Sequence, residues 1–165
     1  MSLRLFIVLG LISLLAGCSS GVKIDDDKAR LDALRSSLSD AQARQIVVQE
    51  AVKQLGVSYR YGGLTPNDGF DCSGLVFHVY LKTGRWLPRK SQDQFIYANK
   101  SAQPKPGDLV FFSSKIKLKQ VDHVGILLKD DLFIHAPGKG KEVSTSRLSE
   151  PYWQKRFQGS GSYLD

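Results

Sequence analysis

The sequence is poor in the residues that build disulfides and metal sites. Its 165 residues include only 2 cysteines and 3 histidines. Cys18 and Cys72 lie in such different sequence contexts that we do not expect a disulfide between them. Cys72 and two histidines could supply three zinc ligands, but zinc sites usually contain ligands closely spaced within a turn, and no such spacing occurs here. The composition therefore disfavours a metal centre.

The sequence also lacks an apolar run long enough to cross a membrane. The run 5–15 holds 11 residues, whereas a hydrocarbon layer of about 30 Å requires roughly 20. It follows Arg4 and ends in Leu-Ala-Gly-Cys18, which resembles a bacterial lipobox. We expect residues 1–17 to be a signal peptide and Cys18 to carry a lipid anchor, including palmitate, that holds the protein on a membrane. A cleaved secretory signal and a buried helix are the alternatives.

Acidic residues are outnumbered, and the formal net charge is +7. Loss of residues 1–17 would lower it only to +6, because Arg4 is the one charged residue in that segment. In an exported protein, this charge favours anionic envelope polymers or membrane surfaces as partners and disfavours nucleic acid. Ser19, in place of an aspartate retention signal, predicts the periplasmic face of an outer membrane.

Internal repeats and low-complexity segments are absent, so one compact domain is expected. Residues 18–38 are interpreted as a lipidated tether, polar over 19–27, followed by a short helix over 28–38. Ser39 and Gln42 match a capping box, and the domain is predicted to span 39–165. A helix begins after Ser39, and Gly56 supplies its left-handed stop.

The rest of the chain changes from helical to strand periodicity. Glycines and a proline predict a loop over 59–69, and Asp71 can cap a helix that starts at Cys72 and stops before Gly84. A short helix over 92–97 follows. Short apolar runs then predict strands over 109–112, 122–128, 132–136, 142–145 and 156–164. Helices first and an antiparallel sheet of about five or six strands afterwards predict an α+β fold.

Cys72 is a candidate nucleophile. The first turn of a helix lowers the pKa of a thiol through unpaired backbone N–H groups and the helix dipole. The negative charge of Asp71 opposes this effect unless capping occupies the carboxylate. The alternative is a buried and inert cysteine.

Two histidines are candidate partners of the thiol. His78 lies six residues after Cys72 on one helix, so its side chain should point away from the sulfur. His123 and His135 lie on consecutive strands, and a three-residue loop over 129–131 would place them on one face as diagonal neighbours. A two-residue loop would place them on opposite faces. A purely structural role for both is the alternative.

Six motifs together resemble the NlpC-type cysteine peptidases. They are Tyr59-Arg60-Tyr61-Gly62-Gly63, Asp71-Cys72-Ser73-Gly74, Leu87-Pro88-Arg89, the run 106–112, Asp122-His123-Val124-Gly125-Ile126 and Phe133-Ile134-His135-Ala136. The resemblance covers residues from Ser39 to the C-terminus. It implies a reduced papain-like fold and hydrolysis of amide bonds in bacterial cell-wall peptides, commonly between D-glutamate and a diamino acid.

The resemblance also implies a role for individual residues. Cys72 would be the nucleophile, His123 the base and His135 the residue that orients the base. Tyr59 matches a tyrosine implicated in holding the oxyanion. The same motifs imply that Asp71 and Ser73 read the free amine of the stem peptide. Arg89 could meet a substrate carboxylate or belong to a charged turn.

These interpretations predict a thiol protease of the cell envelope that cuts peptidoglycan stem peptides. We expect it to act as a monomer and to need neither a metal nor an organic cofactor. One alternative is a non-catalytic wall-binding or adaptor lipoprotein on the same scaffold. Another is an amidase or acyltransferase with a different substrate. Trp86, Tyr152 and Trp153 could form a sugar-stacking surface, although aromatic residues of a small domain more often pack in its core.

Overall fold

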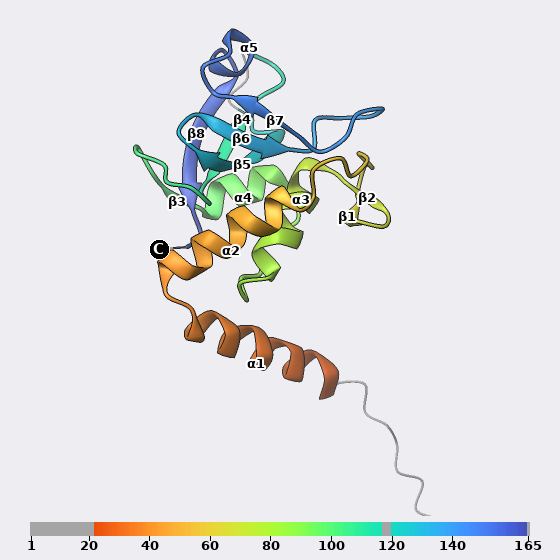
Figure 1. Cartoon of the computed structure of the whole chain (residues 1–165), viewed down its shortest axis with the longest axis vertical. Coiled ribbons are helices and arrows are strands. Elements are labelled where there is room, and N and C mark those ends of the chain that lie inside the picture. The colour runs from red at the N-terminus through yellow and green to blue at the C-terminus, as the bar shows by residue number, and fades with distance from the viewer. Residues whose placement is uncertain (1–21, 117–119, 165) are drawn as a thin grey trace, which may run out of the picture.

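A computed structural model describes residues 22–116 and 120–164 (Figure 1). The predicted signal peptide, the lipid attachment site at Cys18 and Ser19 lie outside these residues. Within them, every helix is too short or too polar to cross a bilayer. Over the same ranges, no three histidine, cysteine, aspartate or glutamate side chains gather as metal ligands would.

Five helices precede or flank the sheet in the described part of the chain: α1 (Val22–Ser37), α2 (Asp40–Val52), α3 (Cys72–Leu81), α4 (Ser91–Tyr97) and α5 (Pro151–Gln154). The capping box at Ser39 is confirmed, since its hydroxyl accepts from the backbone of Gln42 and the Gln42 side chain accepts from the backbone of Ser39. The prediction of a polar, non-helical tether over 19–27 is wrong from Val22 onward, because α1 begins there. An acidic residue in the first turn of α1, Asp25, suits the positive end of a helix dipole.

The main sheet has six strands in the order β3-β8-β4-β5-β6-β7, and every pairing is antiparallel. Its strands are β3 (Asn99–Lys100), β4 (Leu109–Phe112), β5 (His123–Lys129), β6 (Leu132–His135), β7 (Ser144–Arg147) and β8 (Phe157–Ser162). A two-stranded ribbon pairs β1 (Leu64–Thr65) with β2 (Gly69–Phe70). The predicted α+β fold is confirmed, whereas α5 and the two-residue strands were not anticipated.

The sheet is apolar on both faces. The larger core lies between the sheet and helices α2 and α3, and it includes Val47, Leu75 and Ile126. On the other face, Val110, Phe112, Leu127 and Phe133 form a smaller cluster that Trp153 of α5 partly covers. Figure 1 shows α2 and α3 on one side of the sheet and α5 at its far end.

The hairpin between β5 and β6 sets the faces of the two candidate histidines. Its connection is the two-residue turn Asp130-Asp131, the case expected to place them on opposite faces. However, the register shifts between Leu127 and Lys129, and this bulge adds one residue to β5. The bulge restores the odd offset that a three-residue loop would have provided. His123 and His135 therefore share a face despite the short turn.

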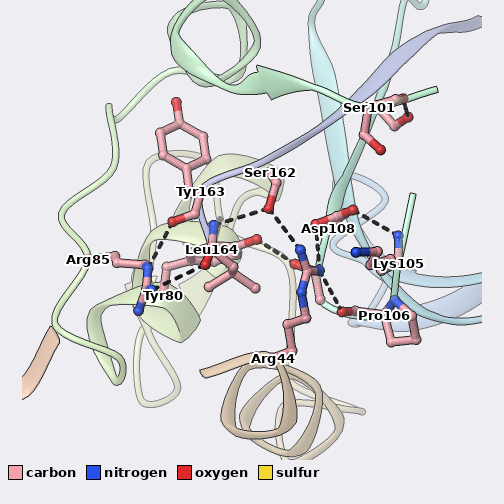
Figure 2. A network of polar contacts seen from close by, with 12 residues as sticks. Arg44, Tyr80, Arg85, Ser101, Lys105, Pro106, Asp108, Ser162, Tyr163 and Leu164 are labelled. Atoms are coloured by element: carbon pink, nitrogen blue, oxygen red, sulfur yellow. Dashed lines mark hydrogen bonds and ion pairs between the residues drawn. The ribbon is translucent and has the colours of Figure 1, made fainter. Parts of the chain in front are cut away.

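A buried polar network joins α2 to the start of β4 and the end of the chain (Figure 2). Arg44 donates to the Asp108 carboxylate at 2.7 Å, to the carbonyl of Pro106 and to the Ser162 hydroxyl. Asp108 is 1% exposed and also accepts from the backbone N–H of Lys105. The network fixes α2 against the ends of the interior strands β4 and β8, although the helix bears no candidate site residue.

Candidate active site

The glycine-rich loop and the start of α3 hold Cys72. Asp71 is the N-cap of α3, and its Oδ1 accepts from the backbone N–H of Gly74 at 2.7 Å. Its Oδ2 accepts from the N–H of Gly62 at 2.9 Å. A Cβ on Gly74 would lie 2.0 Å from the carbonyl oxygen of Gly63, so only glycine lets the loop approach the helix this closely. The loop thus presents Cys72 as the first residue of α3.

Arg89 binds the cap residue directly. Its Nη2 lies 2.6 Å from Asp71 Oδ2, and its Nη1 donates to Asp71 Oδ1 and to the Ser73 hydroxyl. Burial alone would raise the pKa of Asp71, but the bonds from Arg89 and Gly74 outweigh it and hold this pKa below its ordinary value. Three residues singled out from the sequence therefore form one cluster, and Arg89 is not simply part of a charged turn.

The Cys72 thiol is neutral at ordinary pH. Burial and then the Asp71 carboxylate raise the pKa of Cys72 to about 11, although backbone N–H groups at the helix start lower it. Its sulfur lies 4.0 Å from the carbonyl oxygen of Asp122. The prediction that helix position lowers this pKa is wrong in its net direction, because desolvation exceeds the effect of the helix end. Nucleophilic chemistry here requires a base.

His123 and His135 form a hydrogen-bonded pair. His123 Nε2 lies 2.8 Å from His135 Nδ1, and His135 Nε2 lies 3.3 Å from the Ser146 hydroxyl. Burial lowers the pKa of His123 to about 4, and burial together with His123 lowers that of His135 to about 3. Both rings are therefore neutral near neutral pH. With His123 Nε2 occupied, its Nδ1 is the nitrogen left to act as a base.

Ser146 was missed by the sequence reasoning. The strand expected over 142–145 stops one residue before it, whereas the observed β7 runs from Ser144 to Arg147. The alternation Ser144, Ser146 along an edge strand was the available signal. In the register with β6, Ser146 pairs with Phe133 and so lies on the same face as the histidines.

Trp153 packs against both imidazoles. Its ring stacks on His123 at a centroid distance of 5.6 Å, and it meets His135 edge-on at 4.9 Å. The core interpretation is thus supported for Trp153. It is wrong for Trp86 and Tyr152, which are 71% and 54% exposed. The ring of His78 packs against that of Phe70 at a centroid distance of 5.2 Å.

The thiol and the base open into one cleft. It has a volume of about 300 Å³, and its lining includes Tyr59, Cys72, His123, Trp153 and Arg156. Asp71, Ser73 and Arg89 are not in its lining. His135 lines a separate hollow on the β7 side of Trp153. Cys72, His123 and Tyr59 are therefore the predicted residues that a substrate in this cleft would meet.

This arrangement contains the groups that thiol-dependent acyl transfer requires. A cysteine begins a helix, so backbone N–H groups lie beside the sulfur, where such sites bind an oxyanion. A neutral histidine lies on the adjacent sheet, and a second histidine is hydrogen-bonded to it. The fold and this candidate site are together those expected of an α+β cysteine hydrolase.

The chain belongs to the NlpC/P60 family, whose model matches residues 56–162. It is 42% identical over 132 residues to the gamma-DL-glutamyl hydrolase of Bacillus subtilis, an alignment that covers 78% of this chain and 32% of that protein. It is 34% identical to the murein DD-endopeptidase MepH of Escherichia coli, over 86% of this chain and 51% of that one. The chain thus spans about half or less of these curated relatives.

Solved structures show the same fold. An NlpC/P60 family protein from Bacillus cereus superposes with a TM-score of 0.70 at 27% identity, over 74% of this chain and 40% of that one. A protein from Staphylococcus aureus described as similar to a lipoprotein of the NLP/P60 family superposes with a TM-score of 0.66 at 36% identity. That superposition covers 74% of this chain and 42% of the other. The family match starts at residue 56, so α2 lies outside it. This helix nevertheless belongs to the same core, because Val47 and Ala51 pack into it.

Proposed function

We propose that this protein is a cysteine endopeptidase that hydrolyses an amide bond in peptidoglycan stem peptides. One observation carries the proposal. Cys72 and His123 line a single cleft, and His123 is held by a 2.8 Å hydrogen bond to His135. Membership of the NlpC/P60 family supports the substrate class, because relatives include a murein endopeptidase and a glutamyl hydrolase.

The first half-reaction forms a thioester. His123 Nδ1 accepts the thiol proton as the Cys72 sulfur attacks the amide carbonyl carbon. The backbone N–H of Cys72 and the Tyr59 hydroxyl would donate to the oxyanion, and one such donor contributes about 3 to 4 kcal/mol. His123 then gives its proton to the leaving nitrogen. The C–N bond breaks, and the acyl group remains on sulfur.

The second half-reaction releases the acid. His123 takes a proton from water, the hydroxide oxygen attacks the thioester carbon, and the C–S bond breaks. The sulfur recovers the proton from His123, so the enzyme returns to its starting state. Throughout, His123 Nε2–H donates to His135 Nδ1, while His135 Nε2–H donates to Ser146. This order of donors keeps the base in the tautomer that the reaction needs.

For the bond that is cut, we infer the linkage between D-glutamate and a diamino acid. The name of the relative at 42% identity refers to glutamyl hydrolysis, and another is a gamma-D-glutamyl-L-lysine dipeptidyl-peptidase at 32% identity. The relative MepH is named for a DD bond instead. Digestion of stem peptides that contain both bonds would distinguish the two specificities by fragment mass.

For location, we propose a lipoprotein anchored through Cys18 on the periplasmic face of an outer membrane. The lipobox-like run before Cys18 supports this proposal. Metabolic labelling with a palmitate analogue would test it. The wild-type chain should incorporate label, and Cys18→Ala should not, while Cys72→Ala should label normally. Equal labelling of the Cys18→Ala chain would contradict the anchor.

The enzymatic proposal is tested on purified cell-wall sacculi. The wild-type protein should release soluble peptide fragments, and Cys72→Ala should release none although its circular dichroism spectrum is unchanged. A wall-binding protein without activity would instead bind the sacculi equally well in both forms and release nothing. Fragment release by the Cys72→Ala protein at the wild-type rate would refute a thiol mechanism.

A further inference from the structure

Arg156 is an unpaired cation in the wall of the active-site cleft. It follows α5, and within the described ranges it is the only lysine or arginine that lines the cleft shared by Cys72 and His123. The half-buried Arg89 and Arg44 have acidic partners, Asp71 and Asp108, whereas the buried Arg85 donates to backbone carbonyls away from this cleft. For Arg156, no carboxylate partner occurs among residues 22–116 and 120–164.

The guanidinium of Arg156 is held in place by neutral groups. Its central carbon lies 3.8 Å from the centroid of the Tyr152 ring, a cation–π contact. Its Nη1 donates to the carbonyl of Tyr152 at 3.1 Å. The backbone carbonyl of Arg156 accepts from the N–H of Ser113, which ties this residue to the end of β4. The positive group is thus oriented before any ligand arrives.

One edge of this guanidinium lacks an acceptor. Nη1 is occupied, whereas Nη2 has no hydrogen-bond partner in the part of the chain that the structure describes. Nε also has no partner there, but the protein encloses this atom, so a ligand in the cleft would meet Nη2. A carboxylate that accepts from Nη2 forms a charge-assisted hydrogen bond, which is stronger than one between neutral groups.

The position of Arg156 indicates which part of a substrate it would meet. His123 delivers the proton to the leaving nitrogen, so the leaving residue must lie beside this imidazole. Ser114, Asp122 and Arg156 line the same cleft as His123. The Asp122 carboxylate accepts from the N–H and hydroxyl of Ser114, and Arg156 supplies the one positive charge among the described residues that line this cleft.

We propose that Arg156 is a specificity residue that binds a free carboxylate on the residue whose amine leaves. This inference rests on the proposed peptidase function and deepens it. The ligand class is an amino acid or peptide residue that carries both the scissile nitrogen and an ionised carboxyl group, as a diamino acid of a stem peptide can. A substrate with that carboxyl amidated loses the charge-assisted contact with Arg156 and binds more weakly.

The test uses two synthetic stem peptides that differ only in this group, one with a free carboxylate and one with a carboxamide. Steady-state kcat and KM are measured for the full chain and for the Arg156→Gln, Arg156→Lys and Lys155→Gln variants. Lys155 is the adjacent, exposed residue, so its variant controls for the loss of one positive charge.

The wild-type protein should favour the carboxylate peptide by about 10-fold or more in kcat/KM, the effect of one charged hydrogen-bond pair. Arg156→Gln should remove this preference through a higher KM for the carboxylate peptide. Arg156→Lys should retain part of the preference, and Lys155→Gln all of it. Circular dichroism and the rate of Cys72 alkylation verify that each variant is folded.

The outcomes separate the two claims. Equal cleavage of both peptides by the wild-type protein, or an equal loss on both peptides in Arg156→Gln, would overturn the role of Arg156 and leave the peptidase proposal standing. Cleavage of neither peptide by the wild-type protein would refute the peptidase proposal itself, and the role of Arg156 with it.

Discussion

His123 Nε2 lies 2.8 Å from His135 Nδ1, although the two residues belong to different strands. A bulge in β5 places them on one face of the sheet, and Trp153 packs against both rings. The bond leaves only Nδ1 of His123 for proton transfer. For Nδ1 to accept the thiol proton, His123 Nε2 must carry the hydrogen, so in this mechanism His135 Nδ1 accepts and the proton of His135 lies on Nε2, toward Ser146. The orientation of the base thus depends on a chain of two hydrogen bonds.

Replacement of His135 tests this chain. His135→Ala should lower kcat by about 100-fold or more with little change in KM, because the His123 ring loses the acceptor that selects its tautomer. His135→Asn keeps an acceptor oxygen and should recover part of the rate. Steady-state kinetics on a defined stem peptide measures both. A wild-type kcat in His135→Ala would show that the second histidine does not orient the base.

The pH dependence tests the protonation states of the resting site. His123 acts as a base only when neutral, and burial lowers its pKa to about 4. The value of kcat/KM should therefore rise as pH increases through about 4 and stay level at neutral pH. The acid limb would instead lie near the ordinary histidine value of about 6.5 if burial did not matter. A limb at that higher pH would contradict a neutral, buried imidazole.

The same burial has a consequence for stability. In the unfolded chain both histidines bind a proton below about pH 6.5, whereas in the folded protein they remain neutral down to about 4 and about 3. Stability should accordingly be fully present above about 6.5 and decline as pH falls below it. Urea unfolding of wild type and a His123→Gln variant would show a smaller decline in the variant. Identical pH dependence would exclude this contribution.

The charge of Asp71 should control the reactivity of Cys72. Burial is the largest cause of the rise in the thiol pKa to about 11, and this carboxylate is the second largest. Asp71→Asn retains an oxygen for the helix cap but loses the charge, so the thiol pKa should fall and alkylation at neutral pH should accelerate. Asp68→Asn, at an exposed position of the same loop, is the matched control. Slower alkylation in Asp71→Asn would contradict the assignment.

The Arg44–Asp108 pair should be a main determinant of stability. The two side chains are 13% and 2% exposed, and loss of Asp108 removes this buried ion pair together with the acceptor of the Lys105 N–H. Asp108→Ala should therefore cost about 3 to 5 kcal/mol in the free energy of unfolding. Asp32→Ala removes the exposed Lys28–Asp32 pair and should cost less than about 1 kcal/mol. Urea denaturation measures both, and equal losses would rule out a special role for the buried network.

Several features were predictable because they depend on local chemistry. The capping box at Ser39 and the helix that starts at Cys72 both follow from short-range patterns. Features that depend on tertiary contacts could not be predicted from the sequence. The bulge at Leu128 is invisible in a hydrophobic pattern, and the pKa of Cys72 is set by burial that only the folded protein determines.

Arg89, Trp153 and Arg156 illustrate the same limit. Arg89 was a candidate for substrate binding or a charged turn, and its fork-like contact with Asp71 arises from segments 18 residues apart. Trp153 and Arg156 belong to α5 and the residues that follow it, an element too short to be recognised from periodicity. That element nevertheless forms one wall of the cleft.

The central claim is that the Cys72 thiol hydrolyses a stem-peptide amide. Its most direct test is mass spectrometry of the products from a defined stem peptide incubated in ¹⁸O-labelled water. The wild-type protein should yield two fragments, with one ¹⁸O atom in the new carboxyl group of the acyl fragment, and Cys72→Ala should yield none. Intact peptide with the wild-type protein, undiminished cleavage by Cys72→Ala, or acyl transfer to an amine without ¹⁸O would contradict it.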